Sequence, residues 1–194
     1  MNSFARVKIL LRGYFKWLGR NKCRASSTVT LVQDDNKNII IDTGTHNNRQ
    51  KLIKALAKEN LEPEDINYVI ITHAHTDHLE NLGIFTQAQS MNVFELKKGD
   101  VFQLSEELYN KGEKELTPNT KIIATPGHTT DCISVLVNTS KGKILIAGDL
   151  FVTKQIEKGI FVENRKNWEK SRKKMIKAAD YIIPGHSGMF KIKK

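Results

Sequence analysis

Cysteine and long apolar segments are both scarce in this chain. Its 194 residues include two cysteines, Cys23 and Cys132, and neither has a second cysteine at CxxC spacing. Two cysteines argue against a disulfide framework and favour a reducing compartment, so we expect a cytoplasmic or nuclear protein with both thiols in or near the core. The first apolar run, residues 7–11, is shorter than a signal-peptide core, and no run reaches the roughly 20 residues of a membrane span. We therefore expect no membrane partner.

Proline and glycine are also few, at 4 and 12 residues, and no linker or low-complexity stretch interrupts the chain. Residues 1–194 are therefore predicted to form a single domain, and a hydrophobic content of 39% is typical of a globular one. Positive charge is in excess, because 31 basic residues oppose 21 acidic ones. The excess is uneven: seven basic residues and one acid, Glu169, lie between Arg165 and Lys177. This distribution indicates an electrostatic preference for a polyanion.

The most informative stretch follows the apolar run at residues 68–71. It contains His73, His75, Asp77 and His78 in the pattern H-x-H-x-D-H. An apolar run that ends in clustered polar residues is typical of a buried strand whose tip carries a site. Imidazole and carboxylate groups are together ligands for zinc, iron or manganese, and nitrogen-rich sets favour zinc. A histidine-rich surface loop is the simpler alternative, and the positions of the other histidines argue against it.

Three further residues of metal-ligand type occupy the same position relative to apolar runs. His128, Asp149 and His186 each follow such a run, so five of the six histidines lie at predicted strand ends. Strand ends hold ligands rigidly, so little ordering is needed when a metal binds. Five imidazoles and two carboxylates exceed the four ligands of a closed structural zinc site, which commonly includes cysteine. The inventory therefore predicts two adjacent divalent ions and a catalytic site with room for water and substrate.

The remaining hydrophobic pattern alternates between strand and helix signals. Strands are predicted at residues 7–11, 28–32, 39–41, 68–71, 92–96, 101–104, 121–124, 133–137, 143–147 and 181–183. Polar turns join 28–32 to 39–41 and 133–137 to 143–147, so each pair predicts a hairpin. Helical spacing predicts helices at 48–60 and 164–179, with a shorter one at 79–85. This mixture indicates an α/β protein.

The ordered set from His73 to His186 resembles the metal-binding pattern of the metallo-β-lactamase superfamily, and short stretches such as residues 24–32 and 147–151 resemble its small single-domain members. The resemblance implies a four-layer αββα sandwich with the metal site at one edge, between the two sheets. It implies that one ion binds His73, His75 and His128, that the other binds Asp77, His78 and His186, and that Asp149 bridges them. The small members imply an endoribonuclease and suggest a homodimer. Because Asp149 stands where the best-known β-lactamases carry cysteine, a dedicated antibiotic-degrading enzyme is not expected.

The predicted chemistry is hydrolysis by a hydroxide that bridges two metal ions, because coordination lowers the pKa of water from about 15.7 to about 7. Asp77 and Asp149 are the predicted catalytic residues, with Asp77 also placed to accept the proton of the hydroxide. Asp42 is interpreted either as a residue that orients a metal ligand or as a turn cap. His46 is interpreted either as a substrate contact near the mouth of the site or as an exposed loop residue.

The substrate prediction depends on the basic helix. At helical spacing its lysines share one stripe, opposite the apolar residues Trp168, Met175 and Ala179: Lys166, Lys170, Lys173, Lys174 and Lys177. Such a face suits a phosphodiester backbone, so RNA or another polyanion is the favoured substrate. A solvated lysine-rich helix is the alternative interpretation. Hydrolysis of a small thioester, lactone or β-lactam, and a non-catalytic polyanion-binding protein with a structural metal site, are the other functions left open.

Overall fold

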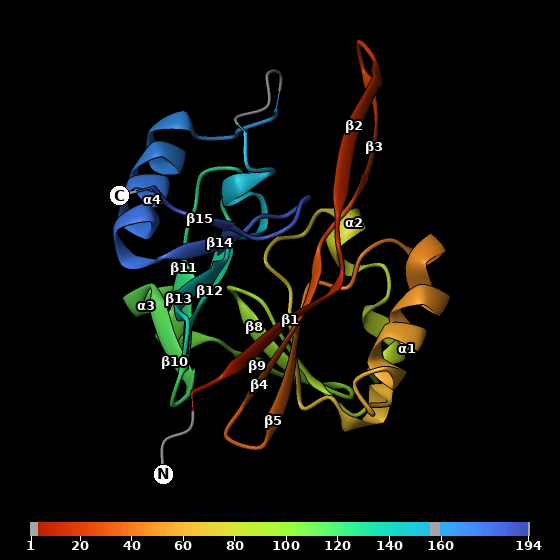
Figure 1. Ribbon diagram of the computed structural model, residues 1–194. Coiled ribbons are helices and arrows are strands. Elements are labelled where there is room, and N and C mark those ends of the chain that lie inside the picture. The colour runs from red at the N-terminus through yellow and green to blue at the C-terminus, as the bar shows by residue number, and fades with distance from the viewer. Residues whose placement is uncertain (1–3, 156–159, 194) are drawn as a thin grey trace.

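Two sheets lie face to face in the computed structural model of the chain, which describes residues 4–155 and 160–193 (Figure 1). The first sheet has the strand order β1-β4-β5-β6-β7-β8-β9. Its strands are β1 (Arg6–Leu11), β4 (Val29–Asp34), β5 (Lys37–Ile41), β6 (Tyr68–Ile70), β7 (Gln89–Met91), β8 (Glu95–Lys98) and β9 (Val101–Leu104). The second sheet has the order β10-β11-β12-β13-β14-β15. Its strands are β10 (Glu113–Thr117), β11 (Thr120–Ala124), β12 (Ile133–Thr139), β13 (Gly142–Ile146), β14 (Tyr181–Ile183) and β15 (Phe190–Lys191).

Helices cover the outer faces of both sheets, with α1 on the first sheet and α4 on the second (Figure 1). The α-helices are α1 (Arg49–Ala57), α2 (Thr76–Leu79), α3 (Glu106–Lys111) and α4 (Arg165–Ala178). Single 3₁₀ turns are η1 (His46–Asn48), η2 (Pro63–Asp65), η3 (Leu82–Ile84) and η4 (Gly148–Phe151). The predicted αββα sandwich is thus confirmed. In the described part of the chain, no helix is both long and apolar enough to cross a membrane.

The inner strands are apolar without interruption because each is covered on both faces. In β5, Ile39 and Ile41 face the core between the sheets, whereas Ile40 packs with Leu52 and Leu56 of α1. The strand β13 repeats this arrangement on the other side of the core. Burial of each such side chain stabilises the fold by about 1.5–3 kcal/mol.

The helix α4 packs on the second sheet through the face that the sequence predicts. Trp168 and Met175 are buried against Leu145, and Ala179 lies in the same cluster. The five lysines of the predicted stripe are all exposed: Lys166, Lys170, Lys173, Lys174 and Lys177. The basic face therefore points to solvent, as expected from its helical spacing.

Several predicted elements differ from the observed ones. The predicted helix at 79–85 is wrong, because the chain forms the short helix α2 earlier and then the single turn η3. The predicted strand at 92–96 is broken by Asn92, whose side-chain oxygen accepts hydrogen bonds from the backbone of Phe94 (2.8 Å) and Glu95 (3.0 Å). This local turn ends β7 and starts β8.

The sequence patterns also missed α3, β10, β15 and a separate two-stranded ribbon. The ribbon consists of β2 (Tyr14–Gly19) and β3 (Lys22–Ser26), and it projects beyond the ends of the two sheets (Figure 1). Its residues are mostly exposed. The ribbon was missed because it lies mostly outside the core and contains no apolar run that would mark a buried strand.

Candidate metal centre

All seven predicted ligands lie at one end of the two sheets, in the segments that follow their inner strands. His73, His75, Asp77 and His78 come after β6, the last two within α2. His128 lies between β11 and β12, Asp149 lies in η4 after β13, and His186 follows β14. The structure gathers them into two groups that could each hold a metal ion: His73, His75, His128 and Asp149 in the first, and Asp77, His78 and His186 in the second.

The first group is built around three converging imidazole nitrogens. The Nδ1 atom of His75 lies 3.0 Å from Nε2 of His73 and 3.1 Å from Nε2 of His128. Asp149 faces the same point, with its Oδ2 atom 3.4 Å from Nε2 of His128. Nitrogen-rich ligand sets of this kind are typical of zinc sites.

The second group faces the other oxygen of the same carboxylate. Oδ1 of Asp149 lies 3.2 Å from Nε2 of His186 and 3.5 Å from Nε2 of His78. Oδ2 of Asp77 lies 3.6 Å from Nε2 of His186. Asp149 therefore presents one oxygen to each group, which is the geometry of a bridging carboxylate.

Three buried ligand atoms around the second group lack hydrogen-bond partners among the described residues: Oδ2 of Asp77, Nε2 of His78, and Oδ1 of Asp149, which faces this group from the first. A buried polar atom without a partner costs about 1–3 kcal/mol, so such atoms seldom gather at one point without a ligand between them. The residues present therefore fit a bound cation.

The outer nitrogen of four imidazoles is held by an oxygen atom. Nδ1 of His128 lies 2.8 Å from the carbonyl oxygen of Phe161, and Nδ1 of His186 lies 3.0 Å from that of Ser26. Nδ1 of His73 lies 3.2 Å from the hydroxyl of Thr72, and Nδ1 of His78 faces a carboxylate, described next. Carbonyl oxygens only accept hydrogen bonds, so in His128 and His186 the proton sits on Nδ1 and Nε2 is free to bind a metal.

Asp42 is the carboxylate that holds His78, as one of the two sequence interpretations proposes. Its Oδ2 atom lies 2.8 Å from Nδ1 of His78 and accepts a hydrogen bond from the Thr72 hydroxyl at 2.9 Å. Its Oδ1 atom accepts the backbone N–H of Thr72 at 2.8 Å. Asp42 is buried, so it ties the end of β5 to the segment that carries the H-x-H-x-D-H motif.

The buried charges of the site stabilise one another. Burial lowers the pKa of His73 well below its ordinary value, and the adjacent His78 lowers it further. Burial would also lower the pKa of His78, but the carboxylates of Asp42 and Asp149 raise it well above the ordinary value. Burial disfavours the ionised form of Asp149, yet His186 and His78 hold its pKa well below the usual range. The Asp149 carboxylate is therefore ionised, as a metal ligand must be.

Close packing brings Asp149 and His186 together. A side chain at Gly185 would place its Cβ atom 2.0 Å from Oδ1 of Asp149, so only glycine fits there. On the opposite side, Asp131 accepts the backbone N–H of Ala74 at 2.9 Å and so links the H-x-H-x-D-H segment to the loop after His128. Sequence reasoning missed both residues, because neither is of metal-ligand type in a recognised pattern.

A cavity of about 220 Å³ opens onto both ligand groups. Apart from the ligands, its lining is apolar: Phe15, Trp17, Cys23, Ala25, Val152, Ile160 and Phe161. The ribbon contributes one face, because Phe15 pairs with Ala25 and Trp17 with Cys23 across β2 and β3. The prediction that Cys23 lies in or near the core is wrong, since it is exposed, whereas Cys132 is buried as expected. A two-stranded ribbon has no further layer to cover it.

His46 does not belong to the cavity lining. It is exposed, its backbone N–H donates to Oε2 of Glu80 at 2.7 Å, and its Nδ1 lies 3.1 Å from the same oxygen. The interpretation of His46 as an exposed loop residue is therefore the better one. This contact anchors the turn η1 to the end of α2.

An αββα sandwich with two groups of histidine and aspartate at one end of its sheets is the arrangement of a class of metal-dependent hydrolases. Residues 24–186 match the family model of the metallo-beta-lactamase superfamily. The chain belongs to this superfamily, as its ligand pattern predicts.

Known relatives support the same assignment. The chain is 34% identical to metallo-beta-lactamase domain-containing protein 1 of Xenopus laevis, over 97% of this chain and 82% of that one. Its fold is similar to that of a candidate metallo-beta-lactamase of Thermotoga maritima, with a TM-score of 0.74, 22% identity, and coverage of 97% of this chain and 99% of that one. It is also similar to a dizinc quorum-quenching lactonase in complex with a product, N-hexanoyl-L-homoserine, with a TM-score of 0.64, 17% identity, and coverage of 88% and 76%.

Proposed function

We propose that this protein is a dinuclear zinc hydrolase that cleaves an acyl bond, as in a lactone, thioester or ester, of a small substrate with an apolar substituent. The carrying observation is the apolar lining of the cavity over the ligand groups. None of the described residues that line it is Lys or Arg. A phosphodiester brings a negative charge at every linkage and favours basic side chains around it, whereas an apolar acyl group suits this small apolar cavity.

The two ligand groups divide the metal binding between them. His73, His75 and His128 would hold one ion, Asp77, His78 and His186 the other, and Asp149 would contact both. Two bound zinc ions supply activated water at neutral pH and stabilise negative charge on the attacked group. The dizinc lactonase of similar fold, which binds an acyl-homoserine product, is consistent with acyl chemistry at this site.

The residues of the chain supply position and proton transfer. Asp77 lines the cavity and its side chain is 21% exposed, so its carboxylate can accept the proton of the attacking water. Asp149 stays ionised and fixes the two groups relative to each other. Phe15 and Trp17 would pack on the apolar part of the substrate and exclude water from it.

A second candidate, phosphodiester hydrolysis, is favoured by the charge of the ribbon. Its outer face and tip carry four basic side chains and no acid: Lys16, Arg20, Lys22 and Arg24. Trp17 is 40% exposed beside them, which would allow a single-stranded base to stack. The lysine stripe of α4 adds to the same attraction. RNA remains the polyanion to test, as the sequence predicts.

Zinc-reconstituted protein should be assayed on an N-acyl lactone, a glutathione thioester, nitrocefin, single-stranded RNA and single-stranded DNA side by side. We expect turnover of the lactone or thioester and none of the nucleic acids. Exclusive cleavage of RNA would overturn the acyl proposal and support the second candidate. Asp149→Ala should abolish turnover with the fold retained by circular dichroism. Full activity in that variant would argue against any dinuclear mechanism.

Two ribbon variants test the role of the cavity. Phe15→Ala should raise KM for substrates with long acyl chains more than for short ones, because it removes apolar contact area. Leu18→Ala is the matched control, since Leu18 is an exposed residue of the same ribbon outside the cavity lining. Equal effects of both variants on KM would contradict the proposed contact.

A further inference from the structure

Two polar residues lie on the buried face of the helix α4. Ser171 and Arg172 follow Trp168 by three and four positions, so the three side chains share the face that packs on the second sheet. Ser171 is buried and Arg172 is half-buried, whereas the five lysines of the stripe are exposed. Buried polar side chains normally have a specific hydrogen-bond partner. For these two residues, the partners lie next to metal ligands.

Arg172 contacts the turn that carries Asp149. Its Nη1 atom donates a hydrogen bond to the carbonyl oxygen of Leu150 at 2.8 Å. Its Cζ atom lies 3.9 Å from the centre of the Phe151 ring and 4.4 Å from that of the Trp168 ring. A guanidinium that stacks on aromatic rings is restricted in rotation, so its N–H groups keep a fixed direction. Arg172 therefore holds the two residues that directly follow the carboxylate shared by both ligand groups.

The turn η4 has few hydrogen bonds of its own, because it is a single 3₁₀ turn. The backbone N–H of Gly185 donates to the carbonyl oxygens of Gly148 at 3.0 Å and Phe151 at 2.9 Å. These bonds connect the turn to the segment after β14, which carries a ligand of the second group. The bond from Arg172 attaches the turn to α4 as well. The position of Asp149 therefore depends on both attachments.

Ser171 makes the corresponding contact with the loop that carries His128. Its hydroxyl donates a hydrogen bond to the carbonyl oxygen of Pro126 at 2.9 Å. The next residue, Gly127, lies directly against the helix, because a Cβ atom there would be 2.3 Å from Cα of Trp168. The loop before His128 is thus fixed to the same turn of α4 that holds η4.

We propose that Ser171 and Arg172 are positioning residues of the metal centre, Ser171 for His128 and Arg172 for Asp149. These two ligands come from the second sheet, whereas the other two members of the first ligand group follow β6 of the first sheet. The helix gives each loop a point of attachment in addition to the strand that precedes it, and so keeps both ligands in place for a metal ion. These roles rest on the proposed metal binding but not on the proposed substrate.

Chelator competition with the zinc-loaded protein tests both roles. Arg172→Met keeps a long side chain between the two rings but removes the donor to Leu150. We expect it to lower the affinity for the more weakly bound zinc ion about tenfold, as is typical when a residue that holds a metal ligand is lost. Arg172→Lys retains a charged donor and should lose less. Ser171→Ala removes the bond to Pro126 and should also weaken zinc binding.

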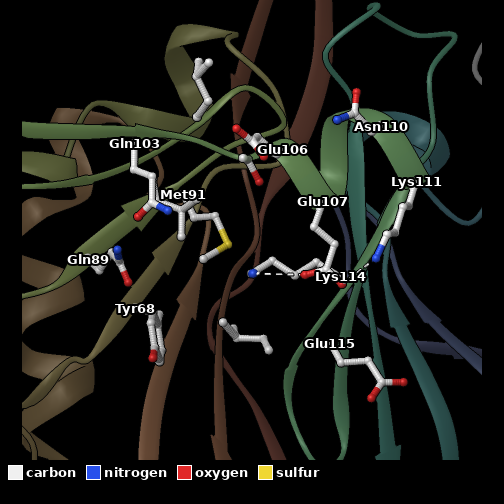
Figure 2. Close-up of a pocket in the computed structure, with 14 residues that line it drawn as sticks. Tyr68, Gln89, Met91, Gln103, Glu106, Glu107, Asn110, Lys111, Lys114 and Glu115 are labelled. Carbon is white, nitrogen blue, oxygen red and sulfur yellow. Dashed lines mark hydrogen bonds and ion pairs between the residues drawn. The ribbon is translucent and has the colours of Figure 1, made fainter.

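Lys114→Met is the matched control for Arg172→Met. Lys114 is also a half-buried cation, and its Nζ atom lies 3.3 Å from Oε2 of Glu107. Figure 2 shows this ion pair in a groove of about 980 Å³ beside α3, whose lining includes none of the seven candidate metal ligands. Lys114→Met should therefore bind zinc as wild type does.

A second control separates positioning from general loss of stability. Leu52→Ala empties part of the core under α1 and should lower the free energy of unfolding without changing zinc affinity. Wild-type zinc affinity in both Arg172→Met and Ser171→Ala would overturn the proposal, as would an equal loss of affinity in Leu52→Ala or Lys114→Met. Absence of acyl hydrolysis by the zinc-loaded wild type would contradict the proposed function alone, because zinc affinity is measured without substrate.

Discussion

Replacing Asp42 by asparagine should remove one metal ion while leaving the fold in place. In the wild-type protein, the carboxylate can only accept hydrogen bonds, so the ring proton of His78 must lie on Nδ1, which is 2.8 Å from Oδ2. In the neutral ring that binds a metal, the Nε2 atom of His78 is then unprotonated, and it faces Asp149 at 3.5 Å. The tautomer of His78 is thus set by Asp42.

Asparagine offers one acceptor and one donor group. The backbone N–H of Thr72, which donates to Oδ1 at 2.8 Å, can only donate, so the amide oxygen must take that position. The NH₂ group then faces Nδ1 of His78 and makes it an acceptor. The ring proton moves to Nε2, where it blocks metal binding. Loss of a residue that hydrogen-bonds a metal ligand typically lowers metal affinity 10–100-fold. Because Asp42→Asn also imposes the wrong tautomer, we expect a loss of metal affinity of about 100-fold, or about 2.8 kcal/mol.

Elemental analysis and chelator competition measure this effect directly. We expect wild type to bind two zinc ions and Asp42→Asn to bind one at the same chelator concentration. Asp34→Asn is the matched control, since Asp34 is also a buried carboxylate but lies at the other end of the β4–β5 hairpin. Two ions bound by Asp42→Asn with wild-type affinity would refute the reasoning from tautomers.

Two further predictions concern the scaffold. Burial disfavours the ionised form of Asp34, but hydrogen bonds from Thr117 and Asn119 of the other sheet lower its pKa. The ionised carboxylate therefore stabilises the folded state above about pH 4, and this contribution is lost as pH falls through the lowered pKa. Asp34→Asn should therefore lower the free energy of unfolding by about 1–3 kcal/mol at pH 7, measured by chemical denaturation. The difference from wild type should shrink in acid, and a difference independent of pH would contradict this role. Gly185→Ala would put a Cβ atom 2.0 Å from Oδ1 of Asp149. We therefore expect weaker zinc binding in the chelator competition and at least about tenfold lower activity in the hydrolysis assay. Unchanged zinc binding would show that the loop yields without displacing the carboxylate.

The ligand pattern was predictable because it is local and chemically distinctive. His73 to His78 occupy six consecutive positions after a buried strand, and His128, Asp149 and His186 repeat that placement. The buried strands and the amphipathic helix α4 were also predictable, since burial on one or two faces leaves a periodic trace. Elements that bury few side chains, such as the mostly exposed ribbon and α3 with Leu108 alone, leave a trace too short to recognise.

The sequence by itself determined the α/β class and the candidate metal ligands, because these depend on hydrophobic period and residue type, and its resemblance to the metallo-β-lactamase superfamily implied the αββα layers. Only the tertiary structure decided how Asp149 faces both ligand groups and which distant atoms set the imidazole tautomers. Those atoms include the backbone carbonyls of Phe161 and Ser26. Every residue has a carbonyl, so its position relative to a distant side chain depends on packing and carries no sequence signal. The same holds for the apolar ribbon face over the site, which exists only where β2 and β3 are placed beside it.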